Sequence, residues 1–335
     1  MQATIYGLSG PVLTDDERRF FRDSDPAGYI LFKRNCIDPP QVEALTESLR
    51  GLSGRADLPI LIDQEGGRVA RMGPPHWPEF PCGWAFAALY EKAPSSAIEA
   101  ARVNAKALAA VLSRAGINVD CLPLLDVRQP QADEIIGDRA LGAEPMQVAA
   151  LGRAILDGLR SGGVVGVIKH IPGHGRALCD SHKELPVVEA SEGELATDLE
   201  PFRTLSWAPM GMTAHVVYTA WDSEQPASQS RTVIGDIIRG AIGFDGWLMS
   251  DDIGMEALKG GFGERAAKVV DAGCDAALHC SGNLEEMIAV AKAVPAMNGR
   301  GEERLKRAME SIAGDRADAD LDQLIAKRDE LLALA

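Results

Sequence analysis

The sequence predicts an α/β fold, a single (β/α)8 barrel in which eight parallel strands alternate with helices. The chain has 335 residues, a length that suits one large barrel as well as two smaller domains. Short β-branched runs alternate with helical patterns along the chain, and polar residues gather directly after the strands. Because α/β barrels carry their chemistry at the carboxyl ends of the strands, this distribution favours the barrel.

The predicted strands are short apolar runs bounded by glycine, proline or charged residues. Residues 164–168 (VVGVI) are the clearest example, because the run is β-branched and ends in Lys169-His170. In chain order the expected strands cover 3–7, 28–32, 58–62, 117–125, 164–168, 210–217, 247–249 and 276–279.

The predicted helices begin at capping residues. Thr14 and Glu17 form a capping box, Pro39 begins the second helix, and Ser191 caps a later one. A long Ala-rich helix begins at Ser95 or Ser96 and stops before Gly116, and further helices cover 145–161, 234–242, 264–272, 284–293, 302–313 and 320–334. Since no linker or repeat interrupts the series, we expect one domain over residues 1–335, closed by C-terminal helices at about 302–334.

Composition argues against several classes of partner. A formal net charge of −15 is the opposite of the basic face that nucleic acids require. No apolar stretch approaches 18 residues, and the N-terminus lacks the pattern of a signal peptide. The six cysteines have no metal-type spacing, so we expect them to stay reduced. The expectation is a cytoplasmic protein that binds neither nucleic acid nor membrane.

The segment that follows residues 164–168 holds the densest group of chemically active side chains. It reads KHIPGHG over 169–175, and Asp180-Ser181-His182 follows. Asp180 and His182 are two residues apart, so their side chains can share one face of a loop. An aspartate that accepts from one imidazole nitrogen raises the basicity of the other, which makes His182 a candidate general acid/base. His174, between two glycines, either functions in the site or only folds the loop.

Two other strand ends carry charged residues. Residues 58–62 end in Asp63, and Arg68 follows a pair of glycines, so we expect both side chains to face a ligand. Residues 247–249 end in Ser250-Asp251-Asp252. Retaining glycoside hydrolysis needs a carboxylate nucleophile near a proton donor. The Asp251-Asp252 pair offers the nucleophile, and the Asp180/His182 pair offers the donor.

These motifs resemble those of the glycoside hydrolase family 3 β-N-acetylglucosaminidases of bacterial peptidoglycan recycling. The string KH-x-P-G-H-G-x4-D-S-H is the most specific, and the matches run in the family order over roughly residues 3–290. They are IDQEGGRV at 62–69, IGDR at 136–139, residues 169–182, MTAHVVY at 212–218, GFDG at 243–246, SDD at 250–252 and AGCD at 272–275.

The resemblance implies a role for each matching residue. Asp251 would be the nucleophile, and His182, oriented by Asp180, the general acid/base. The positions that hold the hydroxyls of the terminal sugar correspond to Asp63, Arg139, Lys169 and His170. The expected activity is that of a retaining β-N-acetylhexosaminidase. The enzyme would release terminal N-acetylglucosamine from muropeptides or amino-sugar disaccharides, without cofactor or metal and as a monomer.

Two alternatives stay open at the sequence level. In the first, the chain is a metal-dependent barrel hydrolase whose ligands are His170, His174, His182, His215 and Asp251, since histidine and carboxylate suit zinc. In the second, it is a sugar-binding barrel without activity. The joint presence of a nucleophile and an acid speaks against the second, because a binding protein has no use for both.

Overall fold

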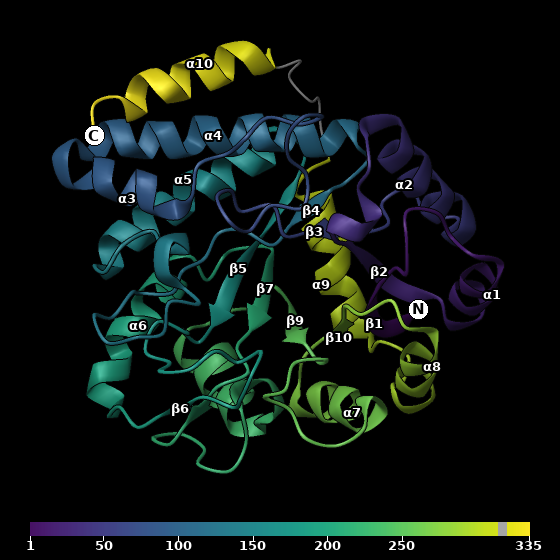
Figure 1. Ribbon diagram of the computed structural model, residues 1–335. Coiled ribbons are helices and arrows are strands. Elements are labelled where there is room, and N and C mark those ends of the chain that lie inside the picture. The colour runs from purple at the N-terminus through teal and green to yellow at the C-terminus, as the bar shows by residue number, and fades with distance from the viewer. Residues whose placement is uncertain (314–319) are drawn as a thin grey trace.

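The computed structural model describes residues 1–313 and 320–335, and its centre is a closed barrel of eight parallel strands, as predicted (Figure 1). Neighbouring strands follow the chain order around the barrel, and the last pairs with the first. The barrel strands are β1 Gln2–Gly7, β2 Pro26–Leu31, β3 Ile60–Ile62, β4 Val119–Asp120, β5 Val165–Ile171, β7 Met210–Thr213, β9 Trp247–Asp252 and β10 Ala276–His279. Two further short strands, β6 Val187–Val188 and β8 Val217–Tyr218, pair outside the barrel.

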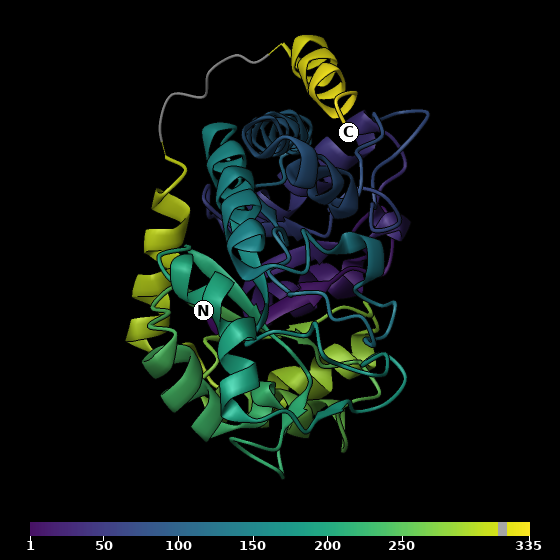
Figure 2. The ribbon, with the colours of Figure 1, turned by 90° about the vertical axis from the view of Figure 1, so that its left-hand side faces the viewer.

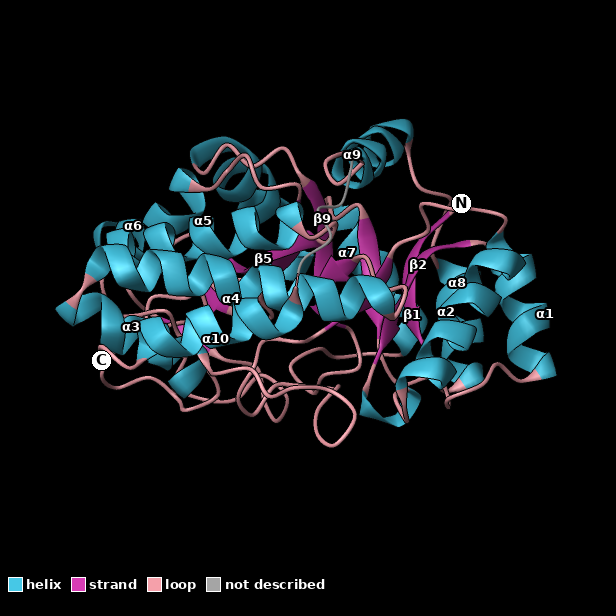
Figure 3. Cartoon of the chain, turned by 90° about the horizontal axis from the view of Figure 1, so that it is seen from above, coloured by secondary structure: helices cyan, strands magenta, loops and turns pink. Residues whose placement is uncertain are grey.

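Helices surround the barrel, as the view in Figure 3 shows. The capping box predicted at Thr14 is present, and Asp38 and Ser191 cap two more helices. The helices are α1 Asp15–Ser24, α2 Pro39–Ser53, α3 Gly83–Lys92, α4 Pro94–Arg114, α5 Pro145–Ser161, α6 Glu192–Thr204, α7 Phe262–Ala272, α8 Leu284–Ala293, α9 Gly299–Glu310 and α10 Leu321–Leu332, with a π-helix, η4, at Val233–Ala241 and short 3-10 turns η1 Lys33–Asn35, η2 Gly137–Arg139 and η3 Ala227–Gln229.

Four predicted strands differ clearly in extent from the structure, and three of these differences change the place of a polar side chain. The strand expected over 117–125 ends at Asp120, since Pro123 has no N–H for a ladder. The run 210–217 divides into β7 and β8, which leaves His215 in the connection between them. Strands β5 and β9 continue through His170 and Asp251, so these residues lie within strands rather than after them.

The last two helices pack at different places on the barrel (Figure 2). Arg304 of α9 forms ion pairs with Asp245 and Asp275, which precede β9 and β10. Helix α9 therefore lies at the amino ends of these strands. Helix α10 runs beside α4, where Arg328 donates to the side-chain oxygen of Asn104 at 3.3 Å. Both helices begin and end within a few residues of the predicted bounds.

Apolar side chains fill the space between the barrel wall and the helices. Trp247, Tyr29 and Phe202 are among the largest side chains that are fully buried. Among the described residues, no helix is both long enough and apolar enough to cross a membrane.

Candidate active site

A cavity of about 280 Å³ lies at the carboxyl ends of the barrel strands. Most of the predicted site residues line it, although they come from distant parts of the chain. The lining includes Asp63, Arg68, Arg139, Lys169, His170, His182 and Asp251, together with Glu65, Arg71, His174 and the apolar Phe32, Met212 and Leu278. The barrel thus brings together β3, β5 and β9, as the positions of the polar residues indicated.

A network of buried charges forms one wall of this cavity. Lys169 Nζ lies 2.9 Å from Asp63 Oδ1 and 2.7 Å from Glu65 Oε1. The Arg139 guanidinium donates two hydrogen bonds of 2.8 Å to the Glu65 carboxylate, a bidentate geometry. Arg71 adds an ion pair of 3.1 Å to Asp63. The Lys169 side chain is only 2% exposed and that of Glu65 4%, so these charges depend on one another.

The pairing outweighs burial for every charge in this network whose pKa shifts. Burial raises the pKa of Asp63 and of Glu65. Lys169, together with the arginine beside each carboxylate, more than offsets this rise, so both pKa values lie below the ordinary value and both carboxylates are ionised. Burial lowers the pKa of Lys169, and the two carboxylates raise it above its ordinary value. The wall therefore presents fixed cations and anions, the arrangement that grips vicinal hydroxyls through charge-assisted hydrogen bonds.

His170 stands beside this wall and is held by Asp126. Asp126 Oδ2 lies 2.7 Å from His170 Nδ1, and Asp126 Oδ1 accepts from the backbone N–H of His170 and of His174. The pKa of Asp126 is about 2, because the imidazoles and these hydrogen bonds outweigh the effect of burial. An ionised carboxylate can only accept hydrogen bonds, so Nδ1 of His170 carries a proton. Nε2 is the ring nitrogen that is not bonded to Asp126.

Asp251 is partly buried near the end of β9, and its surroundings favour the ionised form. Burial raises its pKa, but the nearby imidazoles of His170 and His215 bring it below the ordinary value. Its Oδ1 accepts from the backbone N–H of Asp252 at 2.8 Å. Asp252 differs, because burial raises its pKa and its side chain accepts from the backbone of Gly254. A carboxylate that stays ionised next to a cavity has the properties of a nucleophile.

His215 is fully buried behind Asp251 and supports the end of β9. Its Nε2 lies 3.0 Å from the carbonyl oxygen of Asp252, so Nε2 carries the proton. Burial lowers the pKa of His215, and the neutral ring accepts at Nδ1 from the Ser228 hydroxyl at 2.6 Å. Both ring nitrogens are therefore engaged within the protein.

Asp180 and His182 form the local pair that their spacing predicted. Asp180 Oδ1 accepts from His182 Nδ1 at 2.8 Å and from the His182 backbone N–H at 2.9 Å. The pKa of Asp180 lies below its ordinary value, since these hydrogen bonds outweigh burial. The His182 side chain is 62% exposed and lines the cavity, and its Nε2 is the ring nitrogen that is not bonded to Asp180.

The loop that carries this pair leaves β5 along a closely packed path. A Cβ at Gly175 would lie 2.0 Å from the carbonyl oxygen of Val127, so only glycine fits there. The Tyr218 hydroxyl donates to the carbonyl oxygen of Gly173, and Arg176 pairs with the buried Asp198. The first part of the loop, residues 173–176, is therefore held in place by Val127, Tyr218 and Asp198.

Arg68 lies at the cavity edge, with its side chain turned to the protein. Its Nε donates to Asp138, and Nη2 donates to the carbonyl oxygens of Glu134 and Ile135 at 2.7 Å. In this arrangement it holds the segment 134–138, which contributes to the cavity wall.

Sequence reasoning missed the parts of Glu65, Arg71 and Asp126 in the site. Glu65 stands inside the IDQEGGRV motif, two positions after Asp63, and this spacing was the only sign that both carboxylates could meet Lys169. Asp126 directly follows the strand expected over 117–125, and this position was its only signal. Arg71 had no signal of its own.

The five candidate metal ligands do not form a metal-binding group. Within residues 1–313 and 320–335, no group of three or more histidine, cysteine, aspartate and glutamate side chains is arranged to hold a metal ion. His170, His182 and His215 each use a ring nitrogen on a protein partner, as described above.

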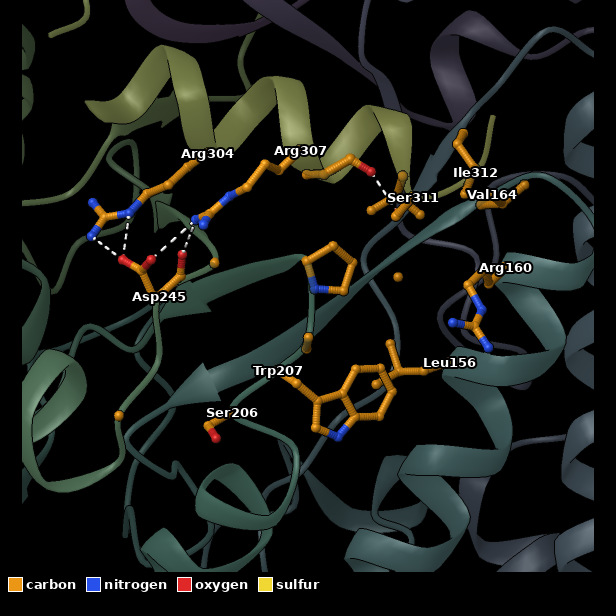
Figure 4. Close-up of a pocket in the computed structure, with 17 residues that line it drawn as sticks. Leu156, Arg160, Val164, Ser206, Trp207, Asp245, Arg304, Arg307, Ser311 and Ile312 are labelled. Carbon is orange, nitrogen blue, oxygen red and sulfur yellow. Dashed lines mark hydrogen bonds and ion pairs between the residues drawn. The ribbon is translucent and has the colours of Figure 1, made fainter. Parts of the chain in front are cut away.

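A larger cavity, of about 530 Å³, lies at the opposite end of the barrel (Figure 4). Arg304 and Arg307 reach Asp245 on one side of it, and Trp207 and Arg160 lie on the other. Each of its charged groups has an ion-pair partner in the protein, Asp157 for Arg160 and Asp245 for Arg304 and Arg307, and the cavity holds none of the predicted site residues. Because barrel enzymes place their chemistry at the carboxyl ends of the strands, the smaller cavity is the candidate active site.

Comparison with known proteins agrees with this placement. Residues 7–313 match the model of the glycosyl hydrolase family 3 N-terminal domain. The chain is 40% identical over 279 residues to a beta-hexosaminidase of Thiobacillus denitrificans, which covers 82% of this chain and 77% of the relative. It is similar to the structure of NagZ from Neisseria gonorrhoeae in complex with N-trifluoroacetyl-D-glucosamine, with 32% identity, a TM-score of 0.88 and coverage of 100% of this chain and 98% of that one.

A longer relative shares the same barrel. The structure of a glycoside hydrolase family 3 beta-N-acetylglucosaminidase from Paenibacillus sp. has a TM-score of 0.87 and 29% identity, and the match covers 98% of this chain but 66% of that chain. The chain therefore spans just under two thirds of that protein. The motifs, the barrel and the family match lead to one conclusion: this chain belongs to glycosyl hydrolase family 3 and is a glycoside hydrolase.

Proposed function

We propose that the protein is a retaining β-N-acetylhexosaminidase that releases terminal N-acetylglucosamine from the non-reducing end of β-linked peptidoglycan fragments. One observation carries the proposal: an ionised carboxylate, Asp251, and an aspartate-bound imidazole, His182, line the same small cavity. Retaining hydrolysis needs these two groups together.

The charged wall fits the terminal sugar of such a substrate. A cavity of about 280 Å³ is at the small end of ligand pockets, so it suits one sugar ring. Asp63, Arg139, Lys169 and His170 would hold the hydroxyls of this ring, with Glu65 fixing Lys169 and Arg139 in place. Arg71 belongs to the same wall, because it forms an ion pair with Asp63.

The reaction follows from these positions in two steps. An Asp251 carboxylate oxygen attacks the anomeric carbon while Nε2 of His182 donates its proton to the leaving oxygen, which breaks the glycosidic bond and forms a glycosyl ester. The neutral His182 then takes a proton from water, whose oxygen attacks the same carbon and releases Asp251. Asp180 holds the imidazole by Nδ1 and stabilises its charged form.

The names of similar proteins support the acetamido sugar. The Thiobacillus denitrificans relative is called a beta-hexosaminidase, and the Neisseria gonorrhoeae structure holds an N-acylated glucosamine. We propose a muropeptide or amino-sugar disaccharide as the natural substrate, action in the cytoplasm as a monomer of one domain, and no need for a cofactor, since side chains fill both catalytic roles.

Substrate class and stereochemistry test this proposal. The purified enzyme should hydrolyse an aryl β-N-acetylglucosaminide faster than the matching β-glucoside, and proton NMR of the first product should show the β-anomer. A much faster glucosidase activity, or an initial α-anomer, contradicts the proposal. Asp251→Ala should lower kcat by at least about 10³-fold, the scale observed when nucleophiles are removed.

Leaving-group dependence tests His182. A sugar alkoxide cannot leave without a proton, whereas a dinitrophenolate can. His182→Ala should therefore nearly abolish disaccharide cleavage, yet give a burst of dinitrophenol from the activated glycoside followed by slow turnover. Equal losses on both substrates would assign the acid/base role elsewhere.

A further inference from the structure

Ser181 is a buried residue within an exposed part of the loop. It is 2% exposed, although the next residue, His182, is exposed and Leu178 is 68% exposed. Within residues 178–185 it is the single buried position. Ser181 is therefore turned inward between Asp180 and His182, the two members of the proposed acid/base pair.

The contacts of Ser181 join residues 180–182 to the first part of the loop and to the segment after β9. Its Oγ lies 3.2 Å from Nε2 of His174, which follows β5. Its carbonyl oxygen accepts from the backbone N–H of Ala257 at 3.3 Å, and Ala257 follows β9, the strand of Asp251. Ser181 therefore connects the loop with the segment that continues from the nucleophile strand.

The hydrogen bonds of the catalytic pair itself do not fix its position. Asp180 accepts from His182 by side chain and backbone, from Lys183 and from Glu184, all in the same short segment. These contacts set the shape of the segment, but they leave its distance from Asp251 undetermined. Among the described hydrogen bonds of residues 180–182, only those of Ser181 reach beyond this short segment, to His174 in the first part of the loop and to Ala257 after β9.

His174 is suited to hold Ser181. Its ring is 3% exposed, and its backbone N–H is fixed by Asp126 at 2.7 Å. Burial lowers the pKa of His174 to about 4, so the imidazole is neutral at neutral pH. Its Nδ1 has no hydrogen-bond partner among the described residues, which makes the bond to Ser181 the only one that the ring forms there.

We propose that Ser181 is a positioning residue, and that its contacts with His174 and Ala257 hold the Asp180–His182 pair over Asp251. The inference rests on the proposed acid/base role of His182. Ser181 itself lines the cavity beside His174 and His182, and the role proposed for it is to support the Asp180–His182 pair through its two hydrogen bonds. It acts by keeping Nε2 of His182 at the cavity edge during proton transfer.

Kinetics with two leaving groups test this role in Ser181→Ala, which removes one oxygen atom and little else. We expect kcat/KM for a β-1,4-linked N-acetylglucosamine disaccharide to fall about tenfold, the effect of losing one buried hydrogen bond. The burst on the dinitrophenyl glycoside should change by less than about twofold, because that step needs no proton. Added azide should accelerate steady-state turnover of the dinitrophenyl glycoside in the variant, since azide attacks the glycosyl enzyme without a general base.

The matched control is Leu178→Ala, an exposed position in the same loop, which should leave both rates unchanged. His182→Ala is measured in parallel, so that the two proposals are separable. If His182→Ala shows the leaving-group pattern and Ser181→Ala behaves as wild type, the positioning role is wrong and the acid/base assignment stands. If His182→Ala shows no such pattern, the acid/base assignment itself fails.

A double-mutant cycle tests the partner. If the hydrogen bond carries the effect, Ser181→Ala combined with His174→Leu should lose little more disaccharide activity than the larger single loss. Additive losses, or a Ser181→Ala defect that is equal on both substrates and insensitive to azide, would show a general structural effect and overturn the proposal.

Discussion

Replacing Asp126 by asparagine tests the support beneath His170. Asp126 is fully buried and accepts hydrogen bonds from the backbone of His170 and His174 and from the His170 ring. Asparagine can keep the two backbone bonds through its oxygen. Its amide group, however, presents a donor to Nδ1 of His170, which forces the ring proton to Nε2. The substitution therefore removes a charge and reverses a tautomer.

The expected loss of stability follows from the pKa of this carboxyl. It is about 2 in the folded protein and 3.8 ordinarily. At about 1.4 kcal/mol for each pH unit by which folding lowers a pKa, ionised Asp126 stabilises the fold by roughly 2 kcal/mol. Because the folded-state pKa is the lower one, this contribution is complete at neutral pH and is lost as the pH falls from about 4 to about 2. Asp126→Asn should lack this contribution at every pH, so its difference in stability from wild type should be largest at neutral pH and should disappear near pH 2.

Urea unfolding at pH 7 measures this loss, with Asp236→Asn, at an exposed position of η4, as the control. We also expect kcat/KM for the aryl N-acetylglucosaminide to fall by about 10- to 100-fold, the range found when the partner of a functional histidine is removed. An Asp126→Asn protein with wild-type stability and wild-type kinetics would refute the reasoning.

Three further measurements address the charged wall, the loop and the chemistry. Glu65→Gln leaves Lys169 and Arg139 without their shared carboxylate, so urea unfolding should show a loss of about 3–5 kcal/mol. The folded-state pKa of His174 is about 4, below its ordinary 6.5, so the unfolded chain binds the proton more readily. The stability of the wild type therefore falls as the pH drops from 6.5 to 4. In urea unfolding over that interval, wild type should lose about 3 kcal/mol more stability than His174→Leu. Treatment with EDTA should leave the hydrolase activity unchanged, and a loss that zinc restores would revive the metal-dependent alternative.

The barrel could be predicted because its strands repeat one simple pattern. Most are short apolar runs with polar residues near or just after their carboxyl ends: Asp63 follows β3, and Lys169 and Asp251 lie near the ends of β5 and β9. The boundaries were harder, since apolar residues continue past a strand when they fill the core from a loop. The segment after Asp120 shows this: residues 121–125 are buried and apolar, yet β4 ends at Asp120 and only an isolated bridge joins Leu124 to Lys169 of β5.

The site was predictable where one motif holds both partners. Asp180 and His182 are two residues apart, and their hydrogen bond could be expected from that spacing. Glu65 and Arg139 are 74 residues apart, and nothing in either segment indicates that their side chains meet. The inward turn of Ser181 was hidden for a related reason, because burial of a loop serine depends on contacts with distant elements.

The charged wall also limits how this protein can be redesigned. Lys169 bridges two carboxylates, and each carboxylate is shared with an arginine, so a change at one member leaves a neighbour unmatched in a dry environment. A new sugar preference is therefore more accessible through the neutral residues of the cavity, such as Met212 and Leu278. A variant library at these two positions should yield folded protein far more often than one directed at the ion pairs, and its members would change the shape of the cavity while its charges stay balanced.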